Sequence, residues 1–591
     1  MGPLTEPCAY VRLLFLISSL LPLWTFVVTA REVYDPEREW YREEGNPGLK
    51  VRLTAKGLNY IRQVMVNLLN DEIPNIRGLN AQGAFGEAQV TLSNIKVTRW
   101  RPADYTLLRT VPPNKMVFGL ENADLGLHAD FLGQQNVFKL PGIIEGEARG
   151  LTMAAEMTLT EEDGGLVITP TSCKAVVQTS TFEIIPDPKN IAAALVKPHL
   201  PAANNALRAF LPTVFCKAIT GALDAIGKQL VGAERLRIRL SPDALRSTVT
   251  QTLGRETADE LESPQLPAGL QSQVGSGFQG DAAAHFLQDA VLDVTLLRDP
   301  IATYDFIETW HKADVFFDNN AVRTPFSARP MPNWLETDKM IYVQTSEFII
   351  NAMMYHLYLN DKMNVKLTSD RLPGPFRNFL RTTCTGDTKP PDVTLPPSFQ
   401  QNVLEKVCLG SLIPSLGAEY PNRSVELEFY PHGVPEYRIS DGQGVMQSNG
   451  RILAYVPDDR GDRKQVLVIN TDMAADSTLQ VNEQNIVGDV TVRKLDLTVH
   501  RSALRQLNPK NVEQLSPVAK QIMAPEIARL LQNGFPLPMQ GLIRMENPTV
   551  KLDNGYALVS SDLVVNQLAL QQRFSDQLKG ALAGGGPSFG G

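Results

Sequence analysis

The chain has 591 residues, of which 43% are hydrophobic and 20% are charged, and its formal net charge is −8 at pH 7. A single hydrophobic core usually stops growing near ~250–300 residues, so the sequence predicts at least two cores. The acidic balance excludes a general electrostatic attraction to nucleic acid or to an anionic membrane, and no nucleic-acid partner is expected.

The N-terminus predicts a secretory signal peptide over residues 1–30. Arg12 is followed by sixteen uncharged, mostly apolar residues, LLFLISSLLPLWTFVV, and then by Thr29-Ala30 before the charged Arg31. An uncleaved membrane anchor is the alternative, but the run is shorter than the ~20 residues of a spanning helix and contains Pro22. The protein is therefore expected to be secreted and extracellular.

The first predicted unit of the mature chain is a strand followed by an apolar helix over residues 46–71. Residues 49–54 alternate between apolar and polar, which is typical of a half-buried strand, and helical spacing follows up to Pro74. The same change of pattern recurs over residues 339–361, and Leu-Asn-Asp at 69–71 is repeated at 359–361. The recurrence suggests duplication of one domain, with coincidence as the alternative.

Short alternating segments, separated by Gly, Pro and Asn/Asp turns, follow over residues 83–185 and predict an antiparallel meander. An apolar helical tract comes next over residues 191–231, which Pro198, Pro201 and Pro212 must bend or restart. Residues 241–284 are polar and predict a linker or flexible insertion.

The remainder of the chain mirrors the first half. Strands are predicted at 290–294 and 315–317, and alternating segments between residues 425 and 499 predict several more. A helix over residues 511–531, kinked at Pro517 and Pro525, precedes a final hairpin at 549–559. A twisted sheet around apolar helices encloses an elongated space, which either side chains or an apolar ligand can fill, and periodicity does not decide between them.

Four cysteines remain once the signal peptide, with Cys8, is removed, and an even number in a secreted chain predicts two disulfides. Three pairings are possible. The preferred one, Cys173–Cys216 and Cys384–Cys408, keeps each bridge within its own half of the chain. Asn422-Arg423-Ser424 is an N-glycosylation sequon in a predicted surface loop, so Asn422 is the expected glycosylation site.

Four features in this order resemble the family of bactericidal/permeability-increasing, lipopolysaccharide-binding and phospholipid- and cholesteryl-ester-transfer proteins. They are Asn46-Pro47-Gly48 before a strand, Lys56-Gly57-Leu58 at the helix start, the pair Cys173 and Cys216, and the segment NGFPLP at 533–538. The resemblance extends from about residue 46 to residue 565. It also implies the Cys173–Cys216 disulfide, whereas Cys384 and Cys408 are not part of the family pattern.

The resemblance implies an α+β fold of two tandem antiparallel barrels, each wrapped around long helices and joined by a central sheet in a boomerang shape. We expect an N-terminal lipid-binding barrel at 31–240, a linker at 241–284, central-sheet strands at 285–335, a C-terminal lipid-binding barrel at 336–567 and a disordered tail at 568–591. Residues 554–567 are expected to return to the central sheet or to the barrel edge.

The implied function is that of a secreted protein that holds phospholipid-type acyl chains in two apolar grooves and carries them between membranes or lipoprotein particles. For each candidate residue, an ordinary core position is the alternative. The candidate lining residues are Leu58, Ile61, Met65, Leu68, Leu207, Phe210, Leu211 and Val214 in the first barrel, and Phe348, Met354 and Tyr355 in the second.

The balance of charge departs from that of the antibacterial member, which binds lipopolysaccharide with a strongly basic barrel tip. Residues 31–240 contain 24 Lys and Arg against 23 Asp and Glu, a difference of +1, so direct killing of bacteria is not expected. Innate-immune binding of lipopolysaccharide is the alternative function, because Arg99, Trp100 and Arg101 could contact lipid headgroups at a membrane surface. A solvated loop with a partly buried Trp is the other interpretation of this triplet.

An enzyme is not expected. The sequence has no Gly-x-Ser-x-Gly elbow, His-Glu-x-x-His helix or phosphate-binding loop, and its seven histidines are scattered, so no metal or other cofactor is predicted. A lipid hydrolase remains a distant alternative. Gly275–Gly280 matches a dinucleotide-binding pattern without the flanking strand and helix, and Arg460-Gly461-Asp462 is either an adhesion tripeptide or, as its place between two strands favours, a hairpin turn.

Overall fold

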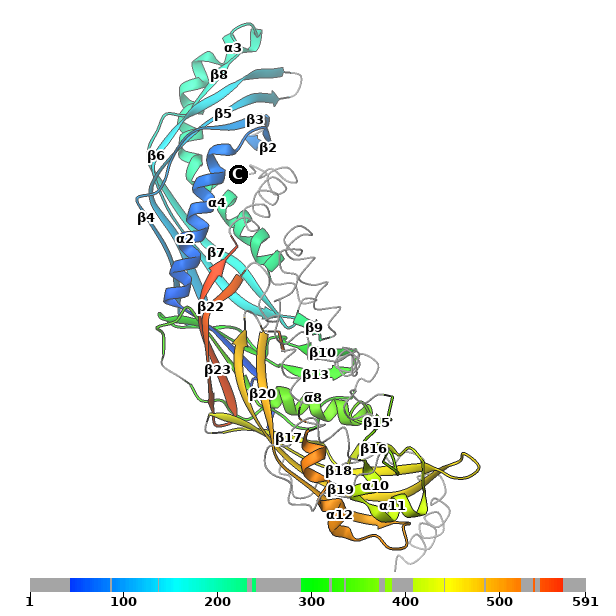
Figure 1. Ribbon diagram of the computed structural model, residues 1–591. Coiled ribbons are helices and arrows are strands. Elements are labelled where there is room, and N and C mark those ends of the chain that lie inside the picture. Colours follow the sequence, from blue (N-terminus) through cyan, green and yellow to red (C-terminus); the bar gives the residue numbers. More distant parts are fainter. Residues whose placement is uncertain are drawn as a thin grey trace, which may run out of the picture.

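A computed structural model describes residues 43–566 apart from 86–87, 136–137, 231–235, 241–288, 318–321, 334–335, 371–377, 385–407, 441, 483–484, 522–523, 525–534 and 537–542. The predicted signal peptide, linker and tail lie outside these residues. Figure 1 shows an elongated, bent molecule with the N-terminal half at one end, the C-terminal half at the other and a sheet between them. The predicted α+β class with curled antiparallel sheets is confirmed.

The N-terminal half is built on one antiparallel sheet with the order β2-β3-β5-β6-β7, to which β4 adds on β5 and β8 adds on β6. The meander predicted for this region is confirmed. The strands are β2 (Leu79–Phe85), β3 (Ala88–Arg101), β4 (Tyr105–Val111), β5 (Lys115–Gln135), β6 (Phe138–Glu162), β7 (Gly165–Ser180) and β8 (Glu183–Pro186).

Two of the turns predicted inside this sheet are instead bulges within long strands. Asn94 has φ 52° and lies inside β3, where the register with β5 shifts, and Asn122 has φ 61° and lies inside β5, where the register with β6 shifts. Asn tolerates the left-handed region, so it can interrupt a ladder without ending the strand. The strands therefore run on through these positions, to 14 residues in β3 and 21 residues in β5.

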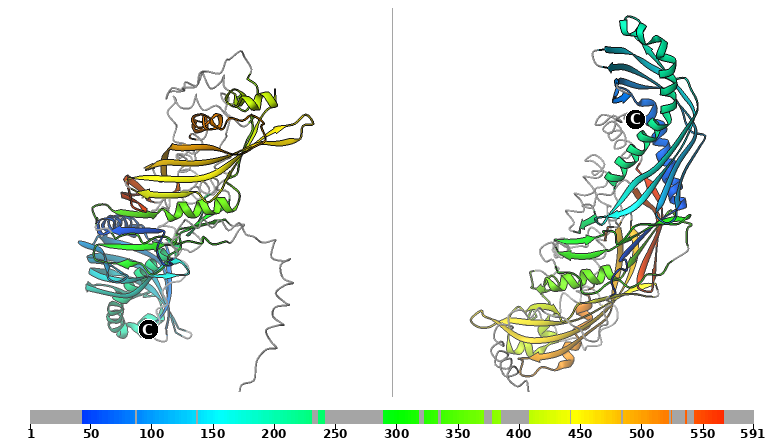
Figure 2. Two further views of the ribbon diagram at one scale, coloured as in Figure 1. Left: turned by 90° about the horizontal axis from the view of Figure 1, so that it is seen from below. Right: turned by 180° about the vertical axis from the view of Figure 1, so that it is seen from behind.

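Three helices accompany this sheet: α2 (Ala55–Glu72), α3 (Ile191–Val196) and α4 (Leu200–Leu230). A short 3₁₀ turn with Pro198 separates α3 from α4, as the prolines predicted. Helix α4 continues through Pro212, so of the bend or restart predicted there, the restart does not occur. Figures 1 and 2 show α2 and α4 running lengthwise along the curl of the sheet.

A six-stranded antiparallel sheet joins the halves in the order β11-β12-β1-β14-β23-β22. Its strands are β1 (Leu49–Thr54), β11 (Ile301–Ala302), β12 (Phe306–His311), β14 (Ile341–Ser346), β22 (Ile543–Asp553) and β23 (Tyr556–Val565). The two predicted strand–helix units meet here, because β1 pairs with β14 about Val51 and Val343 and α8 (Phe348–Leu359) follows β14. The repeated Leu-Asn-Asp does not mark equivalent positions: the first copy lies inside α2 and the second at the end of α8.

Strand β1 is buried on both faces, so the half-buried strand predicted from its alternation is wrong. Lys50 and Arg52 on its polar face are each 2% exposed. Arg52 Nε and Nη2 donate to Glu308 Oε2 at 2.9 and 2.6 Å, and Trp310 Nε1 donates to Glu308 Oε1 at 2.7 Å. Lys50 Nζ donates to the carbonyl of Met331, and burial lowers the pKa of Lys50.

The C-terminal half contains a second seven-stranded sheet with the order β15-β16-β18-β19-β20-β21 and β17 paired to β18. Its elements are β15 (Val365–Leu367), β16 (Glu426–Pro431), β17 (Glu436–Ser440), β18 (Gln443–Pro457), β19 (Arg463–Asn482), β20 (Asn485–Ser502), β21 (Phe535–Pro536), α10 (Leu409–Leu412), α11 (Pro414–Glu419) and α12 (Pro509–Glu513). Helical structure resumes over residues 516–521, and much of the rest of the predicted helix 511–531 lies outside the described residues.

Helix α8 does not pack inside this C-terminal sheet. Its buried residues join the core formed by the central sheet and a three-stranded sheet of β9 (Arg237–Arg239), β10 (Ala290–Asp293) and β13 (Asp314–Phe317). Asn351 of α8 exchanges two hydrogen bonds with the backbone of Tyr437, and Glu347 accepts from the Ile439 amide. These bonds fix α8 to the edge of β17.

The buried Arg52–Glu308 pair gives a test of how the central sheet is held. Glu308→Gln leaves the Arg52 guanidinium buried without its carboxylate, and breaking a buried pair costs about 3–5 kcal/mol. We expect the free energy of unfolding, measured in urea, to fall by about 3 kcal/mol or more. As a control, Lys56→Ala removes the partly exposed Lys56–Asp562 pair on the same sheet and should cost less than about 1 kcal/mol. Equal losses for the two variants would contradict this account.

Candidate functional site

The candidate site is the apolar interior of the N-terminal curl, between the sheet and helices α2 and α4. The cluster of buried side chains comes from β5, β6, α4 and the turn between β7 and β8: Phe118, Leu120, Ala123, Ala148, Leu151, Met153, Ala155, Met157, Phe182, Leu211 and Phe215. Around it lie apolar side chains that are only partly buried, including Leu69, Leu125, Leu127, Ile144, Ile168, Ala175, Val177 and Leu207. The interior is therefore apolar throughout but not completely covered.

Helix α4 is fixed to this sheet by a disulfide and by polar bonds. Cys173 of β7 and Cys216 of α4 form the predicted bridge, with Cα atoms 5.7 Å apart. Arg208 Nε donates to the carbonyl of Phe182 at 3.0 Å, and Asn204 Oδ1 accepts from the Ile184 amide at 2.9 Å. The helix thus contacts both the edge strand β7 and the short strand β8.

Helix α2 packs through a face slightly different from the predicted one. Its buried residues are Gly57, Leu58, Val64 and Leu68, whereas Ile61 and Met65 are only half-buried. Sequence reasoning missed Val64, although its spacing of seven from Gly57 and four from Leu68 is a helical signal. A Cβ on Gly57 would lie 2.6 Å from the carbonyl oxygen of Met340, so the glycine allows the helix start to approach β14 closely.

The predicted lining residues of the first barrel differ in how much of their side-chain surface remains exposed. A side chain that contacts a ligand needs surface that the protein itself does not cover. Leu58 is 3% exposed and Leu68 and Leu211 are 6% exposed, so they contribute mainly to the core. Ile61, Met65 and Leu207 keep free surface, while the side chains of Phe210 and Val214 lie outside what the structure describes.

The predicted lining residues of the second barrel contact an aromatic side chain of the protein itself. The Phe348 and Tyr355 rings, one above the other on α8, both meet the ring of Phe326 edge-on, with centroids 5.8 and 6.0 Å apart. Phe348 is buried and Met354 packs against the same core. This part of α8 is therefore largely covered by the protein itself, and its contact with lipid stays a prediction.

The Arg99-Trp100-Arg101 triplet is largely occupied by partners within the protein. Trp100 Nε1 donates to Asn70 Oδ1 at 3.1 Å and its ring packs on the N-terminal core. Arg101 binds both oxygens of Asp124, which lowers the pKa of that carboxyl, and it also pairs with Asp104. Arg99 lies 3.5 Å from a Glu147 oxygen. These contacts connect α2, β3 and β5, and contact of the triplet with headgroups stays a prediction.

An exposed apolar group that sequence reasoning missed lies at the far end of the N-terminal half. Phe138 begins β6, Ile185 lies in β8, and Ile191 and Leu195 lie in α3, with 62%, 41%, 86% and 65% of their surfaces exposed. Figure 1 shows the labelled elements α3, β8, β5 and β6 together at this end. The sequence feature that could have revealed this group is the apolar run at 191–196, because a helix this short cannot cover its own apolar side chains. We call Phe138, Ile185, Ile191 and Leu195 the apolar tip.

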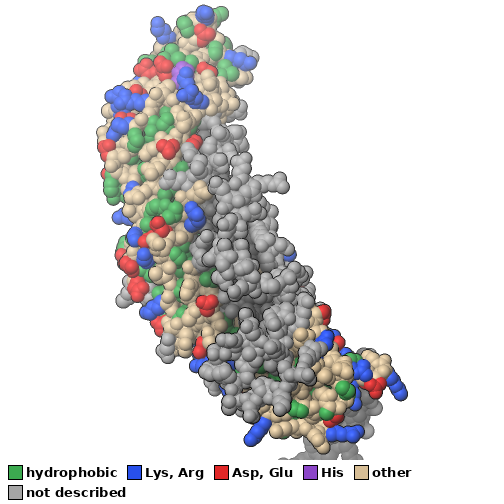
Figure 3. Space-filling view, in the orientation of Figure 1, with side chains coloured by type: hydrophobic (Ala, Val, Ile, Leu, Met, Phe, Trp, Pro, Cys, Tyr) green, Lys and Arg blue, Asp and Glu red, His purple; other side chains and the backbone are tan. Residues whose placement is uncertain are grey.

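Charges of both signs are mixed on one face of this half. On the face shown in Figure 3, Lys and Arg side chains alternate with Asp and Glu over the N-terminal half, without a large patch of one sign. Near the apolar tip, Lys139, Lys189 and Lys197 are exposed. On this face, the small excess of +1 counted from the sequence is therefore not concentrated into a strongly basic patch.

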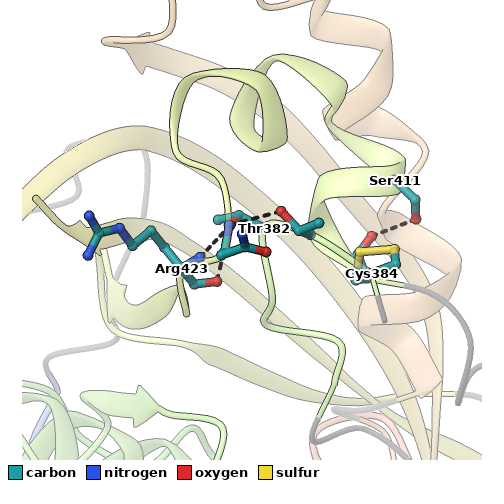
Figure 4. The surroundings of a disulfide bond; sticks show 7 residues. Thr382, Cys384, Ser411 and Arg423 are labelled. Carbon is teal, nitrogen blue, oxygen red and sulfur yellow. Dashed lines mark hydrogen bonds between the residues drawn. A yellow bond between two sulfur atoms is a disulfide. The ribbon is translucent and has the colours of Figure 1, made fainter. Parts of the chain in front are cut away.

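The second predicted disulfide, Cys384–Cys408, is also present, with Cα atoms 5.4 Å apart. It joins the segment 378–384 to the start of α10, and Thr382 in this segment exchanges hydrogen bonds with the backbone of Arg423 (Figure 4). Asn422, the predicted glycosylation site, is exposed beside it with φ 57°. Its glycosylation stays a prediction.

No cluster of three or more His, Cys, Asp or Glu side chains suited to a metal ion occurs among the described residues. His356 is completely buried, and its Nε2 lies 3.1 Å from the Thr324 hydroxyl, which donates a hydrogen bond to Asp314. Burial lowers the pKa of His356, so the group packs as a neutral side chain. Within the described part of the chain, none of the helices has the length and apolar character required to span a membrane.

Comparison with known proteins gives the following similarities. Residues 286–565 match the model of the C-terminal domain of the LBP/BPI/CETP family. The chain is 20% identical to a bactericidal permeability-increasing protein of Sebastes schlegelii over 528 residues, which covers 88% of this chain and 95% of that protein. It is 19% identical to human lipopolysaccharide-binding protein over 525 residues, covering 88% and 94%.

Human phospholipid transfer protein is 22% identical over 409 residues, which covers 67% of this chain and 70% of that protein. Among solved structures, that of a lipopolysaccharide-binding protein aligns over 88% of this chain and 100% of its own, at 16% identity and a TM-score of 0.42. The resemblance noted in the sequence is confirmed, and two of the relatives named here are a lipopolysaccharide-binding protein and a phospholipid transfer protein.

The Cys173–Cys216 bridge can be tested by replacing both cysteines with Ala. The two residues are 43 positions apart, and for a loop of that length the chain-entropy model predicts a stabilisation of about 4 kcal/mol. We expect the double variant to unfold at lower urea concentration and α4 to become the first site of limited proteolysis. An unchanged cleavage pattern together with a loss below about 1 kcal/mol would contradict the role given to this bridge.

Proposed function

From its resemblance to the LBP/BPI/CETP family, whose C-terminal domain model matches residues 286–565, we propose that this chain is a secreted lipid carrier. It shelters the acyl chains of a phospholipid-type amphipath inside the N-terminal curl and delivers them to membranes or lipoprotein particles. Relatives named as a phospholipid transfer protein and as lipopolysaccharide-binding protein support this class of ligand.

The observation that carries the proposal is the incomplete burial of the apolar interior between β7, α2 and α4. Along β7 the inward side chains Cys173, Ala175 and Val177 are only half-buried, although α4 lies against this strand. Covering exposed apolar surface is favourable by about 25 cal/mol of free energy per Å². This amounts to about 0.8 kcal/mol for each methylene of an acyl chain. A lipid tail lying along α4 would supply that cover.

The C-terminal half gives a contrast. Its main core joins buried residues of the seven-stranded sheet to those of α10, α11 and α12, among them Leu409, Leu416, Leu495 and Val512. We therefore assign the principal acyl site to the N-terminal half, with Ile61, Met65 and Leu207 as contacts. Met and Ile side chains at such a site adapt to chains of different length and unsaturation. A second lipid in the C-terminal half stays a prediction.

The apolar tip provides the contact with a lipid surface that transfer requires. Phe138, Ile191 and Leu195 can enter the headgroup region while exposed lysines beside them face phosphates. The near-neutral charge of this half favours zwitterionic phospholipid over lipopolysaccharide, because binding the phosphates of lipopolysaccharide calls for a cluster of cations. Lipopolysaccharide recognition is thus the secondary expectation, and the described residues include no metal-binding cluster that could support hydrolysis.

Bound lipid is the direct test. Organic extraction of the purified secreted protein, followed by mass spectrometry, should release about one phospholipid per chain from the N-terminal site. Met65→Glu places a carboxylate against the acyl chain, which is costly in an apolar site, and should reduce the extracted lipid at least about fivefold.

Gln63→Glu is the matched control, because Gln63 lies two residues away on the exposed side of α2 and its change adds the same charge. This variant should retain the lipid of the natural protein. An extract without lipid, or equal lipid in both variants, would contradict the proposed site.

Transfer should depend on the apolar tip. The double variant Ile191→Asp/Leu195→Asp places two carboxylates where the tip meets the surface, so transfer of fluorescent phosphatidylcholine between vesicles should slow about tenfold. Val176→Asp is the control, because Val176 is as exposed as Phe138 but lies on the outer side of β7. Slowing by both variants, or by neither, would contradict contact through the tip.

A further inference from the structure

The turn between β18 and β19 holds Arg460-Gly461-Asp462 in a fixed geometry. The Asp458 amide donates to the carbonyl of Asp462 at 2.9 Å, and the Gly461 amide donates to the carbonyl of Asp458 at 3.0 Å. Gly461 has φ 86°, which only glycine adopts without strain. This is a three-residue hairpin loop in which a tight turn is followed by a left-handed glycine.

The Asp458 side chain makes the turn rigid. Its Oδ1 accepts hydrogen bonds from the backbone amides of Arg460 at 2.8 Å and Asp462 at 2.9 Å. Both flanks of the tripeptide are thus held by one carboxylate. The turn lies at the end of the β18–β19 hairpin, which projects from the C-terminal half (Figure 1).

Most charged side chains around the tripeptide have a partner in the protein. Asp459 pairs with Arg423 at 2.7 Å, Arg463 pairs with Glu426 and Glu428, and the Lys464 ammonium lies 5.4 Å from the centre of the Tyr420 ring. In contrast, among the described residues no hydrogen bond or ion pair involves the side chain of Arg460 or of Asp462. Both residues are exposed.

The hairpin itself needs Asp458 and Gly461, but it needs neither of these two free side chains. Their charges contribute nothing to the turn, since only their backbone groups are bonded. A rigid turn that presents a guanidinium and a carboxylate on either side of a glycine is pre-organised for recognition, because little conformational entropy is lost on binding.

We propose that this turn is a recognition site for an adhesion receptor that reads Arg-Gly-Asp. The Asp462 carboxylate would complete the coordination of a divalent cation held by the receptor, since carboxylate oxygens are preferred ligands of Mg²⁺ and Mn²⁺. The Arg460 guanidinium would enter an acidic pocket and pair with a carboxylate there. The proposal requires the protein to be extracellular, as the predicted signal peptide indicates, and it is independent of lipid binding.

The test is binding of the full-length secreted protein to an immobilised ectodomain of an Arg-Gly-Asp-binding integrin, measured by surface plasmon resonance in Mn²⁺. We expect saturable binding that is abolished by EDTA and competed by a linear Arg-Gly-Asp peptide. Asp462→Glu keeps the charge but moves the carboxylate by one methylene, so affinity should fall at least about tenfold.

Asp459→Asn is the matched control in the same turn, because the Asp459 side chain is fully exposed and its surface pair with Arg423 contributes little. This variant should bind like the natural protein, and the melting temperatures of all three proteins should agree. The proposal would be overturned by absence of binding in Mn²⁺, by binding that persists in EDTA, or by equal effects of the two substitutions.

Discussion

Antiparallel pairing of β1 with β14 is the constraint on which the rest of the molecule depends. Each strand is followed directly by a helix, and antiparallel neighbours run in opposite directions, so α2 and α8 leave the central sheet toward opposite halves. On its other side, β1 is joined to the neighbouring strand β12 by the buried Arg52–Glu308 ion pair. Neither half can therefore be removed without breaking a sheet that both share.

Much of this architecture could be predicted from the sequence, because alternation and helical spacing are local signals. The two strand–helix units and the antiparallel meander were predicted in that way, whereas both disulfides were predicted from the even number of cysteines and a preference for pairs within one half. Local patterns do not show what covers a polar face, so the alternation at 49–54 gave no sign that Lys50 is buried under Met331. Nor do they distinguish an Asn that ends a strand from one such as Asn122 that forms a bulge within it.

The candidate site was predictable in outline but not residue by residue. Helical spacing identifies the apolar stripe of α2, yet it does not rank positions within it, and the structure buries Val64 while leaving Met65 half-exposed. The same limit applies to α8, where Phe326 from a distant segment covers Phe348. The apolar tip was missed because Ile191 looks like ordinary core until its lack of neighbouring elements is known.

The two halves thus share a plan but differ in how completely they enclose their interiors, and this difference is the basis for proposing an acyl site beside α2 and α4. Photo-crosslinking tests that claim most directly. A phosphatidylcholine with a diazirine near the end of one acyl chain would be loaded into the secreted protein, irradiated, and its attachment sites mapped by peptide mass spectrometry. The account predicts adducts on α2, α4 and the inner face of β7. Adducts confined to the outer surface or to the C-terminal half would contradict it.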